Sequence, residues 1–183
     1  VATGEQIRSG DTDWQRENPN LGTRIGTPNM TTAEVFLNGS YDLNDQTELY
    51  AFGGLTQREG KSYALYRAPY WPGVSDCCNL ISGADVNGFQ PTFETDITDN
   101  SLTAGVRGRK MDWDFDASIS SGRNKVDYTV DNSLNMDLGA DSPTTFEPGG
   151  YEFGHAVLNL DVANTFDQLS LGFGTEVRIE NFV

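Results

Sequence analysis

The chain has 183 residues, enough for one ordinary domain, and a formal net charge of −15 from 12 Lys and Arg against 27 Asp and Glu. This charge argues against a nucleic-acid-binding protein, which needs an excess of cations, and against a basic peripheral membrane anchor. No run of about 18 apolar residues predicts a membrane-spanning helix, but strands of a transmembrane β-barrel alternate lipid-facing with lumen-facing residues and therefore average out as polar.

Three strands are expected in the first part of the chain, over residues 32–43, 48–57 and 101–109. Alternation of apolar and polar side chains with a period of two predicts a strand, because successive side chains point to opposite faces. The first and third segments alternate in this way, with Phe36 as the exception in the first. The phase of the second segment is unclear, since both of its faces are mixed.

Three further strands are expected over residues 111–120, 153–162 and 169–180, and the alternation is cleanest in 111–120. Each run is close to the ~9–11 residues that a tilted strand needs to cross a bilayer. If one face of these strands meets lipid, several large apolar side chains belong to it. The residues expected to face lipid are Trp113, Phe115, Ile119, Leu171, Phe173 and Val177.

The connections are predicted to alternate strictly between short and long. The short ones are expected at 44–46, near Lys110 and at 163–168. The long ones are an irregular opening segment at 1–31 and the connections 58–100 and 121–152, all three expected to be outer loops. Outer-membrane barrels sort their connections in this way, with short turns at one end and long loops at the other. A compact soluble domain seldom has loops this long.

Charged side chains gather on the polar faces of these strands. If the opposite face meets lipid, they face water in the lumen of a barrel. There they either form an ordinary solvated surface or contact a plug or a solute. The residues in this set are Arg107, Arg109, Asp112, Asp114, Asp116, Glu176, Arg178 and Glu180.

No metal site, cofactor or enzymatic activity is expected. Asp112, Asp114 and Asp116 would lie about 6–7 Å apart along one strand, but no His, Cys or calcium-loop motif accompanies them. The sole histidine, His155, is expected to be structural. The sequence contains no nucleophile elbow, phosphate loop or zinc-ligand spacing.

The adjacent cysteines Cys77 and Cys78 lie in the long 58–100 connection. A bond between neighbouring cysteines is strained, so the alternatives are pairing with cysteines of another chain or a free thiol pair. The aromatic residues of this loop either touch a ligand, since loops on a rigid scaffold carry binding, or pack the loop on itself. The second is the default expectation.

Short motifs then follow one another in a characteristic order. They are LYAFG at 49–53, GFQP at 88–91, GVRG at 105–108 with WDFD at 113–116, NSLN at 132–135 with Gly139, Ser142, Pro143, Thr144, Phe146 and Gly149, and GTEVRIE at 174–180. In this order and spacing, over about residues 20–183, the chain resembles the barrel region of TonB-dependent receptors.

This resemblance implies a 22-stranded antiparallel up-and-down β-barrel in the outer membrane of a Gram-negative bacterium, closed around a plug and energised by the TonB system. Residues 32–183 would form about six strands of that barrel. The function implied is uptake of a scarce nutrient: a siderophore, haem, a vitamin, a glycan or a peptide. The implied partners are the rest of the barrel, the plug, lipid or lipopolysaccharide, and the nutrient.

The chain departs from the complete family pattern. It lacks a plug, a TonB box and a terminal strand that ends in an aromatic residue, since its last residues are Phe182 and Val183. Six strands also leave two open edges, which cannot lie in lipid. The chain is therefore expected to be a fragment of a receptor or a subunit of a split one.

Two other functions stay open at this point. A complete small outer-membrane barrel of eight strands, with a structural or adhesive role, would need two further strands within 1–31, 60–100 or 122–150. A secreted β-sandwich, such as a lectin or a fibre subunit, would use its open strand edges for assembly by strand addition.

Overall fold

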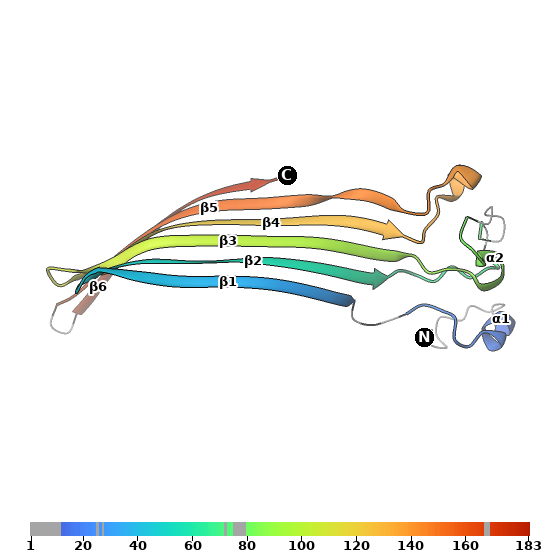
Figure 1. Cartoon of the computed structure of the whole chain (residues 1–183), viewed down its shortest axis with the longest axis horizontal. Helices are drawn as coiled ribbons and strands as arrows, with labels where there is room; N and C mark the ends of the chain where they lie inside the picture. The colour runs from blue at the N-terminus through green and yellow to red at the C-terminus, as the bar shows by residue number, and fades with distance from the viewer. Residues whose placement is uncertain (1–11, 25, 27, 72, 75–79, 167–168) are drawn as a thin grey trace. The chain divides into compact units, whose positions relative to one another are not determined.

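The structure is a computed structural model that describes residues 12–24, 26, 28–71, 73–74, 80–166 and 169–183. In this part of the chain, six strands form one antiparallel sheet in the order β1-β2-β3-β4-β5-β6, so that neighbours in sequence are neighbours in the sheet (Figure 1). The expectation of an all-β, up-and-down architecture is confirmed.

The strands are long and the helices are short. The strands are β1 (Asn29–Asn44), β2 (Thr47–Tyr63), β3 (Thr92–Lys110), β4 (Trp113–Asp131), β5 (Phe146–Phe166) and β6 (Leu169–Phe182). The helices are α1 (Thr12–Glu17), α2 (Ala84–Asn87) and the 3₁₀-helix η2 (Met136–Asp141). None of the described helices has the length and apolar composition needed to span a bilayer.

All six strands extend beyond the segments that show alternation, and four of them thereby shorten the long connections. β2 continues through Tyr63 and β3 already begins at Thr92, so the connection between them is 64–91 instead of 58–100. In the same way β4 and β5 shorten the second long connection to 132–145 instead of 121–152. Backbone pairing needs no alternation of side chains, and polar residues on both faces therefore hid these strand ends.

The hairpin turn between β3 and β4 corrects the predicted start of the fourth strand. Met111 and Asp112 have positive φ angles of 51° and 66° and form the turn, so the strand starts at Trp113 and not at residue 111. A type I′ hairpin turn has positive φ at both central residues, which matches the twist of the flanking strands. The apolar–polar alternation runs on through this turn, which made the turn residues look like part of the strand.

Short and long connections alternate along the described chain, as predicted. Residues 45–46 and 111–112 form two-residue turns, whereas 64–91 and 132–145 are long. The backbone N–H of Gln46 donates to Asn44 Oδ1 at 3.0 Å, a side-chain contact typical of tight turns. Residues 167–168, in the third expected short connection, lie outside the described residues.

The pairing of β5 with β6 confirms the alternation expected for both strands. Leu158 lies opposite Val177 and Val162 opposite Phe173, while Asn159 lies opposite Glu176. Directly opposite residues of an antiparallel pair share a face of the sheet. One face of this hairpin is therefore apolar and the other polar.

The chain divides into two compact units. Unit 1 comprises 1–31, 59–96 and 127–149, and unit 2 comprises 32–58, 97–126 and 150–183. Unit 2 contains parts of all six strands but buries few side chains; Val126 and Val157 are the buried hydrophobic residues among those described.

Unit 1 has a small hydrophobic core of its own. Val74, Ala84 and Phe89 are buried at 2–5% exposure. Trp71, Ile81 and Leu134 pack against them. An antiparallel bridge between Arg67 and Phe89, with N–O distances of 2.7 and 2.9 Å, pairs the start of the 64–91 connection with its end. This long connection is thus packed on itself, as expected by default.

Gly88 directly precedes Phe89 of that bridge, and its substitution is expected to lower the stability of unit 1. Its φ is +72°, and a Cβ at this position would overlap the carbonyl oxygen of Arg67. Gly88→Ala is expected to destabilise unit 1 by about 1–3 kcal/mol, measured as a lower urea midpoint and faster proteolysis within residues 64–91. Gly39→Ala is the control, because a Cβ there would meet nothing within 4 Å. Equal effects of the two substitutions would contradict this account.

Candidate functional site

Two groups of polar side chains are candidates for a functional site, and each lies within one unit. The first, on unit 2, is here named the polar ladder and consists of Glu48, Tyr50, Arg107 and Asp116. The second, in unit 1, is named the polar pocket and is lined by residues from the ends of β2, β3 and β4 together with a segment before β1.

In the polar ladder, side chains of β2, β3 and β4 are linked: Arg107 contacts the neighbouring strand β2, and Tyr50 reaches across β3 to β4. Arg107 Nε on β3 lies 2.9 Å from Glu48 Oε2 on β2, and its guanidinium carbon is 5.1 Å from the centre of the Tyr50 ring. The Tyr50 hydroxyl donates to Asp116 Oδ1 on β4 at 2.7 Å. A Cβ on Gly105 would come within 2.5 Å of the Tyr50 ring, so glycine at this position lets the ring lie across β3.

The other charged residues expected at the site form two separate groups on unit 2. Arg109 lies 3.8 Å from Asp112 and 3.9 Å from Asp114, and all three side chains are exposed. Ion pairs at these distances and exposures contribute little to stability. Asp112 belongs to the turn and not to the strand that carries Asp114.

On β6, Arg178 lies between two carboxylates, 3.0 Å from Glu176 and 3.4 Å from Glu180. These three side chains alternate with Val177 and Ile179, which are 58% and 71% exposed. The expected charged set is thus distributed over the ladder, the β3–β4 turn and β6, and does not form one cluster.

Most of the side chains expected to face lipid are exposed. Trp113, Ile119, Leu171, Phe173 and Val177 are 42–68% exposed. Phe115 differs, since it is only partly exposed and its ring reaches to 3.0 Å from where a Cβ on Gly108 would lie.

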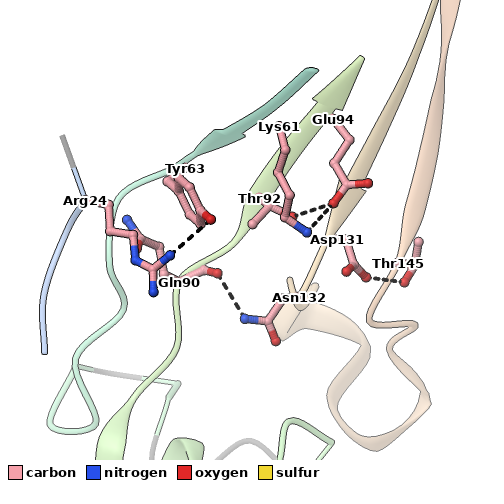
Figure 2. A network of polar contacts seen from close by, with 9 residues as sticks. All are labelled: Arg24, Lys61, Tyr63, Gln90, Thr92, Glu94, Asp131, Asn132 and Thr145. Carbon is pink, nitrogen blue, oxygen red and sulfur yellow. Dashed lines mark hydrogen bonds and ion pairs between the residues drawn. The ribbon is translucent and has the colours of Figure 1, made fainter. Parts of the chain in front are cut away.

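An ion pair at the paired ends of β2 and β3 forms one part of the polar pocket (Figure 2). Lys61 Nζ lies 2.6 Å from Glu94 Oε1, which also accepts a hydrogen bond from the Thr92 hydroxyl at 3.1 Å. The lysine is therefore fixed in place as a cation beside a carboxylate.

The end of β4 contributes an acidic and an amide group. The Thr145 hydroxyl donates to Asp131 Oδ1 at 2.7 Å. The next residue, Asn132, has a positive φ of 52° and donates from Nδ2 to the backbone carbonyl of Gln90 at 2.9 Å. Figure 2 shows both contacts beside the Lys61–Glu94 pair.

The segment before β1 covers the remaining side of the polar pocket. Arg24 Nη1 donates to the Tyr63 hydroxyl at 3.0 Å, and its guanidinium carbon lies 4.8 Å from the centre of that ring. The backbone N–H of Tyr66 donates to the Thr23 hydroxyl oxygen at 3.0 Å, and burial raises the pKa of the Tyr66 phenol.

These groups line an open cavity of about 370 Å³. Its lining residues are Asn20, Leu21, Gly22, Arg24, Lys61, Tyr63, Tyr66, Gln90, Thr92, Asp131 and Asn132. A cavity of this size with convergent polar groups and two aromatic rings is of the kind that binds small ligands.

Sequence reasoning missed the polar pocket and half of the polar ladder. Glu48 and Tyr50 lie in the segment whose phase was unclear, because Tyr50 places an aromatic ring on the polar face. The pocket residues lie where long loops were expected. Gln90 and Asn132 do belong to the motifs GFQP and NSLN, which are part of the family resemblance. No binding role was predicted for either residue.

The lone histidine makes a packing contact. A Cβ on Gly122 would lie 2.5 Å from His155 Cε1, and the His155 ring is 5.8 Å from that of Phe153. Cys77 and Cys78 lie outside the described residues. Within the residues that are described, no group of three or more His, Cys, Asp or Glu side chains is placed to hold a metal ion.

No protein-family model matches this chain, and no curated protein matches it significantly.

The hydrogen bond between Tyr50 and Asp116 can be tested by removing the tyrosine hydroxyl. Tyr50→Phe keeps the ring beside Arg107 and removes the hydroxyl that Asp116 accepts, so the free energy of unfolding should fall by about 0.5–1.5 kcal/mol. A double-mutant cycle with Asp116→Asn measures the coupling. Tyr41→Phe is the control, because this tyrosine is 70% exposed on β1. Additive effects of Tyr50→Phe and Asp116→Asn would contradict the contact.

Proposed function

We propose that this chain forms a section of the wall of an outer-membrane β-barrel of the TonB-dependent receptor type, which imports a scarce nutrient. One observation carries the proposal: a single-layer sheet exposes large apolar side chains from each of its six strands, opposite a face that carries linked charges. Representative exposures are 73% for Leu37, 60% for Leu102, 57% for Leu158 and 71% for Ile179.

An apolar face of this extent needs a cover. Exposed apolar area is unfavourable in water by roughly 25 cal/mol per Å², and soluble monomers seldom leave large contiguous patches bare. Among the described residues of unit 2, no second layer packs on this sheet. Lipid tails would cover the face directly, and this requires no further protein layer on that side.

The opposite face suits water. Glu48, Arg107 and Asp116 are joined across three strands by ion pairs and hydrogen bonds. Charges on a lipid-facing surface are destabilising, whereas a barrel lumen accepts them. The polar ladder then belongs to the lumen wall, where it meets water, a plug or a passing solute.

The two sheet edges require partners in this proposal. β1 and β6 each pair with one neighbour within the described sheet. Unpaired backbone groups in hydrocarbon cost several kcal/mol each, so further strands of the same barrel would pair with both edges. The rest of the barrel and its plug are thus the necessary partners.

The positions of the family-like motifs support the proposal that this chain is part of a barrel wall. GVRG ends β3 and WDFD begins β4, so the two motifs flank the tight Met111–Asp112 turn. LYAFG lies in β2 and GTEVRIE in β6. Short turns at one end of the hairpins and long connections at the other follow the arrangement of outer-membrane barrels.

Site-directed spin labels test the orientation of the sheet. In a Cys77→Ser, Cys78→Ser background, labels at Leu171 and Ile119 should relax faster with oxygen, which concentrates in lipid. Labels at Asp114 and Glu176 should instead respond to a water-soluble nickel chelate. The protein is purified from outer membranes and reconstituted in vesicles with any chain that co-purifies. Labels at Leu171 and Ile119 that respond to neither reagent would indicate a second protein layer, as in a β-sandwich, and would refute the proposal.

The same orientation can be tested by stability measurements, with one arginine substitution on each face of the β5–β6 hairpin. Phe173→Arg places a cation on the proposed lipid face and should lower stability by roughly 2–4 kcal/mol, measured by urea unfolding from vesicles. Asn159→Arg is the matched control, because it lies opposite Glu176 on the polar face and should change stability by less than about 0.5 kcal/mol. Similar losses at both positions would argue against a lipid-facing apolar side.

A further inference from the structure

The polar pocket is balanced in charge, and this restricts what it can hold. Arg24 and Lys61 line it as cations and Asp131 as an anion, and the Glu94 carboxylate lies 2.6 Å from Lys61. Two positive groups therefore meet two negative groups. The pocket contrasts with the chain as a whole, whose net charge is −15. A balanced set of fixed charges favours neither a strongly anionic nor a strongly cationic ligand.

Hydrogen bonds hold the amide side chains of the pocket in defined orientations. Asn132 Nδ2 donates to the Gln90 backbone carbonyl at 2.9 Å, and Gln90 Nε2 donates to the Ala64 backbone carbonyl at 2.7 Å. Each amide uses its nitrogen in these bonds, so its oxygen is positioned to accept from a hydroxyl group. The orientation is set before any ligand arrives, which lowers the entropic cost of binding.

Two tyrosine rings are fixed next to these amides. Arg24 lies against the Tyr63 ring, and Tyr66 contacts the Trp14 ring at a centroid distance of 6.2 Å. The Tyr66 hydroxyl also donates to the backbone carbonyl of Asn87. An aromatic ring has a negative face that attracts weakly positive C–H edges. A pyranose presents such C–H bonds on its faces and hydroxyl groups around its rim.

We propose that the polar pocket binds a neutral oligosaccharide, with a sugar ring against Tyr63 and Tyr66 and its hydroxyl groups on Gln90 and Asn132. The cavity of about 370 Å³ falls in the lower part of the usual range for ligand sites. This inference deepens the proposed function by naming the class of nutrient, and it depends on that function only for the step of transport.

Calorimetry on the protein purified from outer membranes in detergent micelles, together with any co-purifying chain, tests binding. The probes are maltopentaose, cellopentaose, xylopentaose and N-acetylchitopentaose, with citrate as the anionic comparison. At least one neutral oligosaccharide should bind at micromolar to millimolar concentration, and citrate should not. Binding of citrate alone, or of none of the five probes, would overturn the inference.

Variants assign the binding to this pocket. Tyr63→Leu removes the ring and should weaken binding about three- to tenfold, whereas Tyr63→Phe should stay within about twofold. Asn132→Gly tolerates the positive φ of 52° and removes the amide, so binding should weaken about two- to tenfold. Tyr128→Leu is the matched control, because Tyr128 pairs with Phe93 at 5.1 Å and does not line the cavity. Unchanged affinity in both Tyr63→Leu and Asn132→Gly would place the sugar elsewhere and overturn the inference.

The labelling experiment on Leu171 and Glu176 separates the two proposals. If the labels show the expected lipid and water exposure but no oligosaccharide binds, only the assignment of the ligand fails. If an oligosaccharide binds and the Tyr63 and Asn132 variants weaken it, but the labels report a protein interior, then the pocket is retained and the transporter is rejected.

Discussion

Unit 2 depends on backbone pairing between neighbouring strands, because its side chains bury little against one another. Val126 and Val157 are buried, while apolar residues on every strand are half exposed or more. In water such a sheet would have a small hydrophobic contribution to offset the conformational entropy lost on folding. A medium that covers one face and strands that pair with both edges would supply what the described sheet lacks. The proposed orientation in a membrane follows from this constraint, and the polar ladder then lies on the face that meets water.

The two units differ in how far they bury their apolar side chains. Unit 1 packs Val74, Ala84 and Phe89 into a small core, and the Arg67–Phe89 bridge pairs the ends of its longest connection. Its polar side chains are held by hydrogen bonds and an ion pair, as Figure 2 shows for Lys61 and Asn132, and both residues line the cavity. In unit 2, by contrast, polar contacts run between strands along an open face.

The sequence predicted the parts of the fold that depend on local alternation. Apolar and polar residues alternate in 113–120 and, with the exceptions of Val157 and Thr175, in 155–162 and 169–180, and the strands are found there. The predicted strand bounds were wrong where the apolar–polar alternation ran on beyond a strand or was lacking within one. It continued through Met111 and Asp112, whose positive φ angles make them a turn, and it was lacking in residues 58–63 and 92–100, which nevertheless pair. Arg107 and Asp116 were identified as site candidates, but their partners Glu48 and Tyr50 were not.

By itself, the sequence determined the all-β fold class, the order of short and long connections, and which side chains of the β5–β6 hairpin share a face, because these properties follow from the two-residue period of a strand and from turn chemistry. Only the tertiary structure decided which strand ends pair and which distant side chains meet. Gln90 and Asn132 lie 42 residues apart and come together because β3 and β4 are paired, whereas Arg24, 39 residues before Tyr63, contacts it from the segment that precedes β1. Such contacts depend on the register between strands, which turn geometry and the hydrophobic pattern set together.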